Sequence, residues 1–194
     1  QTLASLGKID HFIETLPQSN RILTWTRPTG LETTILQSFA ENGQDVKTLL
    51  EGRYGADYLP SPNGKRILVS MLDARGTANI SLSVMNENGG ELRALGIPTM
   101  VSKVVWSSDN KTLYYALPGN LPAESVLPND YFQKPLFSED TFWKIDTETG
   151  QKTRLIELDE TNSALDSSNL FLSNKEDYLF FINRKDQKLY RLEL

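Results

Sequence analysis

Few side chains in this sequence are of the types that carry chemistry. The chain has no cysteine, which excludes disulfides, thiol catalysis and cysteine metal sites. His11 is its single histidine, so a site of several histidines is excluded, and no Gly-x-Ser-x-Gly segment offers a nucleophile for a hydrolytic triad. Carboxylates such as Asp73, Asp146 and Asp166 form no Asp-x-Asp-x-Asp calcium run. We therefore expect no catalytic residue, no metal site and no cofactor.

The segment 118–140 is the best candidate for a binding surface. Its four prolines stiffen it, and Tyr131, Phe132 and Phe137, with Lys134 beside them, would give a protein partner apolar anchors at low entropic cost. The alternative is that these aromatic side chains fold back and cover the domain itself. A weaker idea, a carbohydrate or small-ligand site, would use Tyr131, Trp25 or Trp143.

The sequence repeats a turn signature three times between short strands of alternating hydrophobicity. The copies are Glu41-Asn42-Gly43, Glu87-Asn88-Gly89 and Glu148-Thr149-Gly150. A second turn recurs with it: Ser61 begins Ser-Pro-Asn-Gly, Ser107 lies 46 positions later, and Ser173 lies 66 positions after that. The longer interval becomes 46 once an insertion of 20 residues, supplied by 118–140, is removed. Two turns that repeat together indicate a repeat architecture.

Each repeat unit reads as four strands. In the second unit these are 56–60, 66–71, 80–85 and 91–95, with turn residues at each junction. Four strands per 40 to 50 residues are typical of a β-propeller blade, whereas a β-sandwich predicts no joint repetition of two turns. We predict an all-β chain of about four antiparallel four-stranded blades, over 8–51, 52–97, 98–158 and 159–194. The 118–140 insertion then lies between the second and third strands of the third blade.

The segments Ser61-Pro62-Asn63-Gly64-Lys65-Arg66-Ile67-Leu68 and Trp106-Ser107-Ser108-Asp109-Asn110-Lys111-Thr112-Leu113 carry a resemblance to a known family. They resemble the W-S-P-D-G-K-x-I/L repeat of TolB-type, WD40-like propellers. Asn63 stands where that family favours Asp, and Leu172 where it favours Trp. The resemblance implies a bacterial envelope or cell-surface setting and a protein partner. A second function left open is an accessory propeller that gates the catalytic domain of a larger hydrolase.

Basic residues are predicted in loops on the same face as the insertion. They are Arg27, Arg75, Arg184 and Lys185. The opposite face would carry Glu41, Glu87 and Glu148 in its turns. This polarity favours an acidic ligand on the insertion side, unless the charges are simply solvated.

The fourth unit ends after its third strand, while residues 1–7 precede the first strand of the first unit. Leu3-x-x-Leu6-Gly7 matches the outermost-strand segment Leu92-x-x-Leu95-Gly96. We predict that strand 2–6 (Thr2, Leu3, Leu6) completes a blade made by the C-terminal unit, because an unpaired edge promotes aggregation. Three forms of closure are open: a four-bladed ring in one chain, an eight-bladed homo-oligomer by strand exchange, or part of a longer propeller.

Composition narrows the remaining function classes. With 39% hydrophobic and 23% charged residues, the 194-residue chain is typical of a globular protein. The net charge of −5 comes without a basic tract, which argues against nucleic acid. No apolar run approaches the roughly 20 residues of a membrane span.

Overall fold

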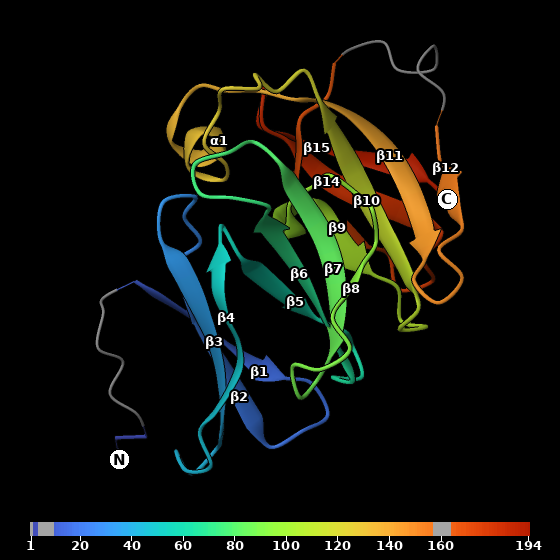
Figure 1. Ribbon diagram of the computed structural model, residues 1–194. Helices are drawn as coiled ribbons and strands as arrows, with labels where there is room; N and C mark the ends of the chain where they lie inside the picture. Colours follow the sequence, from blue (N-terminus) through green and yellow to red (C-terminus); the bar gives the residue numbers. More distant parts are fainter. Residues whose placement is uncertain (1, 4–9, 157–163) are drawn as a thin grey trace.

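The strands lie in four antiparallel sheets that follow one another along the chain, each packed beside the next (Figure 1). The computed structural model describes residues 2–3, 10–156 and 164–194. We call the sheets blades 1 to 4 in chain order. In each of them the strands pair in the order in which they occur in the sequence.

The blades have the following elements. Blade 1 consists of β1 (His11–Leu16), β2 (Arg21–Thr26), β3 (Thr33–Ala40) and β4 (Lys47–Tyr54). Blade 2 consists of β5 (Asp57–Pro60), β6 (Arg66–Leu72), β7 (Ile80–Asn86) and β8 (Arg93–Ala94). Blade 3 follows the 3-10 turn η1 (Val101–Lys103) and consists of β9 (Val104–Trp106), β10 (Thr112–Gly119), β11 (Glu139–Asp146) and β12 (Lys152–Arg154). Blade 4 consists of β13 (Ser167–Leu172), β14 (Tyr178–Asn183) and β15 (Lys188–Glu193).

The predicted all-β propeller architecture is confirmed. The four strands predicted for the second unit agree with β5 to β8 within two residues at each end. β4 extends to Tyr54, three residues past the boundary predicted for the first unit. The insertion contains the short helix α1 (Asn129–Gln133), which the sequence analysis did not predict. A helix of five residues is too short to show a 3.6-residue period in the sequence.

The repeated turn signature forms the hairpins at the outer edges of the blades. Gly43 and Gly89 join β3 to β4 and β7 to β8, and both have φ of +81°. Gly150 joins β11 to β12 with φ of +77°. Only glycine adopts this conformation without steric cost, which explains why the third position of each copy is a glycine.

The core lies between adjacent blades. Clusters of buried apolar side chains join blade 1 to blade 2, blade 2 to blade 3, and blade 3 to blade 4. Blade 2 is covered on both faces, and its central strand β6 has Ile67, Leu68 and Val69 fully buried in succession. In blades 1 and 4, strands such as β3 and β14 alternate between buried and more exposed positions.

The four blades do not close into a ring within this chain, and blades 1 and 4 lie at opposite ends of an open arc (Figure 1). The single-chain four-bladed ring is therefore wrong. The predicted strand 2–6 falls on residues of which 4–6, including Leu6, lie outside the described part.

Candidate functional site

The 118–140 insertion crosses from blade 3 to the loops of blades 1 and 2. The Leu127 N–H donates to the Thr77 carbonyl at 3.1 Å, in the loop between β6 and β7. The Asn129 side chain accepts from the Gly30 N–H at 2.7 Å and donates to the Thr29 hydroxyl at 3.1 Å, in the loop between β2 and β3. Three loops from different blades are thereby held together on one face of the arc, which we call the insertion face.

Close packing of backbone and side-chain atoms also holds the insertion against blade 1. A Cβ atom on Gly30 would collide with the Leu127 carbonyl oxygen and lie 2.9 Å from the Val126 Cγ1. Leu127 itself is buried in an apolar cluster with Leu72, Ile80 and Met100. The insertion is thus part of the core of this face.

A buried ionic network ties blade 3 to blade 4 beneath the insertion. The Lys103 ammonium, at the end of η1, donates to Asp140 at 2.6 Å, to Asp166 at 2.8 Å and to the Ser167 carbonyl at 2.7 Å. The Ser138 hydroxyl lies 2.6 Å from an Asp140 oxygen and 2.9 Å from an Asp166 oxygen, and its single hydrogen can be donated to either carboxylate. All of these groups are buried, and each carboxylate has several donors, as a buried charge requires.

The same network reaches into the insertion through Tyr131 and Arg184. The Tyr131 hydroxyl donates to Asp166, and the Arg184 guanidinium donates to the other Asp166 oxygen at 2.9 Å and to the Tyr131 carbonyl at 2.8 Å. The guanidinium also lies 3.9 Å from the centre of the Tyr131 ring. These bonds fix α1 against blade 4, so the insertion contacts all four blades.

Burial and charge oppose each other within this network. Burial alone would raise the pKa of the Asp166 carboxyl, but the charge and hydrogen bonds of Lys103 hold that pKa below its usual range. Burial likewise favours a neutral Lys103, and the charges of Asp140 and Asp166 with the nearby Tyr131 raise its pKa instead. Both groups are ionised at neutral pH. The network is satisfied internally and offers no free group for chemistry.

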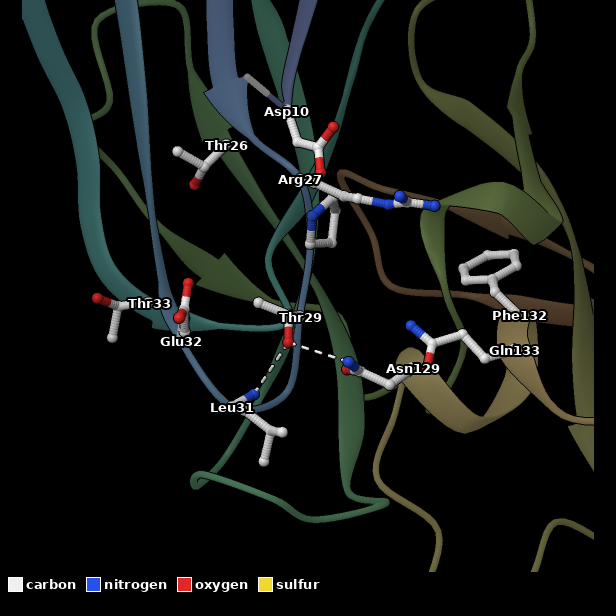
Figure 2. A pocket seen from close by; sticks show the side chains of 11 residues that line it. Asp10, Thr26, Arg27, Thr29, Leu31, Glu32, Thr33, Asn129, Phe132 and Gln133 are labelled. Carbon is white, nitrogen blue, oxygen red and sulfur yellow. Dashed lines mark hydrogen bonds between the residues drawn. The ribbon is translucent and has the colours of Figure 1, made fainter. Parts of the chain in front are cut away.

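A groove of about 560 Å³ lies between the insertion and the end of β2 (Figure 2). Its lining includes Asp10, Arg27, Leu31, Glu32, Phe132 and Gln133. Arg27 is exposed, and its guanidinium has no hydrogen-bond or ion-pair partner among the described residues. Figure 2 shows it extending across the groove toward Phe132, which is 55% exposed. An unpaired cation and an exposed aromatic ring therefore face one cavity.

The structure separates the predicted binding residues into two groups. Tyr131 is only 1% exposed and serves the ionic network, as does Arg184. Phe132, Phe137 and Lys185 are at the surface. Lys134 pairs with Asp130 at 2.8 Å, and the Arg75 Nε donates to the Leu31 carbonyl at 3.0 Å. Fewer of the predicted side chains are therefore free to contact a partner than the sequence indicated. Arg27, in the groove, is an additional exposed side chain that could do so.

The ionic network was missed by the sequence analysis. Lys103 does stand out in the sequence, because it is the one charged residue in the mostly apolar segment from Met100 to Trp106. A lysine in such a place needs a buried acidic partner. Asp140 and Asp166 lie 37 and 63 positions away, and nothing in their local sequence distinguishes them from surface carboxylates.

The remaining candidate side chains, His11, Trp25 and Trp143, contact other residues of the blades. The His11 Nδ1 lies 3.3 Å from the Thr24 hydroxyl within blade 1. The Trp25 indole donates to Asp57 at 3.0 Å, and that of Trp143 to Thr141 at 2.9 Å. In the described part of the chain, no group of three or more His, Asp or Glu side chains could hold a metal ion. Nor does that part contain a helix long and apolar enough to cross a membrane.

The fold is shared with several solved proteins, although no family model and no curated protein matches the sequence. TolB from Agrobacterium tumefaciens matches with a TM-score of 0.65 and 14% identity, over 100% of this chain and 61% of that one. Kuenenia stuttgartiensis hydrazine synthase matches with a TM-score of 0.62 and 18% identity, over 93% and 51%. Oligogalacturonate lyase from Vibrio parahaemolyticus matches with a TM-score of 0.60 and 10% identity, over 94% and 48%. This chain has the TolB-type propeller fold, and it spans about half the length of these proteins.

Proposed function

We propose that this chain, which has the fold of TolB-type propellers, is a non-catalytic scaffold that binds a protein partner on its insertion face. The observation that carries the proposal is the groove in which the unpaired Arg27 faces the exposed Phe132. Neighbours with this fold include lyases and hydrolases as well as TolB, so the fold alone does not select a function.

The rigidity of the insertion supports a binding role. Phe132 sits on α1, directly after Tyr131, whose side chain is fixed by Asp166 and stacked beneath Arg184. An aromatic side chain held in place before binding loses little entropy when a partner covers it. Phe137, the second exposed aromatic residue of the insertion, would extend the contact toward blade 4.

The Arg27 guanidinium, which lines the groove together with the carboxylates of Asp10 and Glu32, indicates the class of segment that would bind there. The Arg27 guanidinium can donate two parallel hydrogen bonds to a carboxylate, and Phe132 and Leu31 offer apolar surface beside it. The proposed ligand is an extended peptide segment with an acidic side chain next to an apolar one. The TolB-type resemblance supports an extracytoplasmic bacterial setting for such a partner.

The proposal is tested by selecting a phage-displayed library of random peptides against the immobilised chain. Selected peptides should be enriched in an acidic residue beside an apolar one, and their binding should fall at least about tenfold in Arg27→Glu and in Phe132→Asp, as for loss of a central anchor. Lys175→Glu, an exposed charge reversal in the turn between β13 and β14, is the matched control and should bind normally. Peptides that bind all variants equally would refute the proposed groove.

A second function is favoured by a separate observation. Puromycin hydrolase and the AtxE2 isopeptidase match with TM-scores of 0.57 and 0.52, and this chain covers 28% and 36% of them. The chain would then be the propeller part of a larger hydrolase and would control access to its catalytic domain. The full reading frame of the parent gene distinguishes the two, because a hydrolase domain in it would replace the scaffold proposal.

A further inference from the structure

The carboxylate of Asp10 shares a wall of the groove with the guanidinium of Arg27. The Arg27 N–H donates to the Asp10 carbonyl at 2.9 Å, one position beyond the pair of His11 with Thr26 that ends the β1–β2 ladder. Asp10 and Arg27 thus lie opposite each other, and opposed residues of an antiparallel pair project their side chains to the same face. Both side chains line the groove. The paired backbone therefore places opposite charges on one wall.

These two charges do not neutralise each other. Within the described part of the chain, neither Asp10 nor Arg27 has an ion-pair partner, and both side chains are exposed. Figure 2 shows the Arg27 side chain extending away from Asp10 and toward Phe132. The groove therefore presents a free carboxylate and a free guanidinium to whatever occupies it.

The other charge on the lining is negative. Among the described residues that line the groove, Glu32 is the second carboxylate, and Arg27 is the single cation. A segment with acidic side chains alone would be attracted by Arg27 and repelled by Asp10 and Glu32. Complementary potentials across an interface select the correct partner and disfavour wrong ones. The lining therefore suits a segment that carries both signs of charge.

We propose that the segment bound in the groove carries a basic side chain in addition to the acidic and apolar ones, and that this basic side chain pairs with Asp10. This assignment rests on the proposed function, because it concerns the same groove. Asp10 then determines specificity. It attracts a basic side chain at one position of the partner and rejects an acidic side chain at that position.

The order of the three side chains follows from the arrangement of the groove. In Figure 2 the Arg27 guanidinium lies between Asp10 and the Phe132 ring. The acidic side chain of the partner is therefore the middle one, with the basic side chain on the Asp10 side and the apolar side chain on the Phe132 side. Leu31, which is 47% exposed, widens the apolar part of the groove.

The spacing of the two charges follows from strand geometry. In an extended segment every second side chain faces the same surface, and such side chains are about 7 Å apart. The basic and acidic residues of the partner should therefore be separated by one residue. Neighbouring positions would direct the two charges to opposite sides of the segment.

The first test repeats the peptide selection on Asp10→Lys. Peptides selected by the parent chain should be enriched in Lys or Arg two positions from the acidic residue. With Asp10→Lys, that position should change to Asp or Glu, while the acidic residue that contacts Arg27 and the apolar residue stay the same. Glu41→Lys reverses an exposed charge in the outer hairpin of blade 1 and is the matched control. It should select the same peptides as the parent.

The second test is a double-mutant cycle on one synthetic peptide from the parent selection. Binding is measured by fluorescence anisotropy, with the parent chain and Asp10→Asn, and with the peptide and a version that has alanine at its basic position. Either change alone should weaken binding by about two- to fivefold, as for an exposed ion pair, and the second change should then add nothing. The loss should shrink in about 1 M salt, where the Debye length is about 3 Å.

The sign of the effect excludes the simplest alternative, in which Asp10 pairs with Arg27 in solution. Asp10→Asn would then free the guanidinium and strengthen binding of the acidic peptide. Stronger binding would overturn the role of Asp10, as would a selection on Asp10→Lys that retains the basic residue. Thermal unfolding checks that both variants are folded, which we expect because the Asp10 side chain is exposed and its carbonyl still accepts from Arg27.

The outcomes separate this assignment from the proposed function. Selected peptides that depend on Arg27 and Phe132 but show no preference for a basic residue would leave the groove as the binding site and refute the role of Asp10. A selection that yields no peptide dependent on Arg27 would refute both.

Discussion

At the residue scale, Lys103 is the side chain on which the stability of the fold depends most. It is fully buried, and it pairs with two carboxylates that lie 37 and 63 positions away in the sequence, Asp140 in blade 3 and Asp166 beside blade 4. Such a group adds little net stability when paired, since desolvation offsets the attraction, but its removal leaves carboxylates buried without their cation.

Substitution Lys103→Met should therefore lower the free energy of unfolding by about 3–5 kcal/mol, the cost of breaking a buried pair. Arg184 still contacts Asp166, but Asp140 loses its cation. Urea unfolding followed by tryptophan fluorescence measures the change. Lys111→Met, which removes an exposed pair with Glu148, is the control and should change stability little. If Lys103→Met lowered stability as little as Lys111→Met does, the buried network would not be important for stability.

At the element scale, the insertion has two roles that the sequence presented as alternatives. Its interior side, with Leu127 and Tyr131, completes the core of the insertion face. Its outer side presents Phe132 and Phe137. Deleting the whole insertion would therefore unfold this face as well as remove the contact residues, and point substitutions are needed to separate the roles.

Gly30→Ala tests how the insertion is seated. The added Cβ would collide with the Leu127 carbonyl, which is backbone and cannot move without displacing the insertion. We expect a loss of about 1–3 kcal/mol in stability, as for other overpacked sites. Amide hydrogen exchange should show faster exchange at residues 121–136. The control is Gly90→Ala, whose nearest neighbour is the movable amide of Asn86. Unchanged exchange would contradict tight docking.

At the scale of the whole molecule, the arc is incomplete in a specific way. Among the described residues, Leu3 packs on the hairpin at Gly43 as Leu49 packs on the hairpin at Gly89, and blade 4 has three strands. It also exposes one apolar face at each end. A propeller has no such ends when it is closed, and both are costly in water.

The repeat, the strands and the turns could all be predicted from the sequence, because these features depend on local spacing. Gly43 and Gly89 mark hairpins through a φ that only glycine adopts easily, and the strands of blade 2 follow from alternation between turn residues. The insertion was also evident, as an interruption of the 46-residue period.

Which distant residues contact each other could not be predicted in the same way, because it depends on how the sheets pack. Lys103, Asp140 and Asp166 come together through the packing of blades 3 and 4, and Arg27 faces Phe132 because the insertion crosses two blades. The tertiary structure also decided that Tyr131 is buried while Phe132, its neighbour, is exposed, since α1 turns adjacent side chains in different directions. Contacts between residues 37 to more than 100 positions apart depend on how the sheets pack, and no local pattern contains that information.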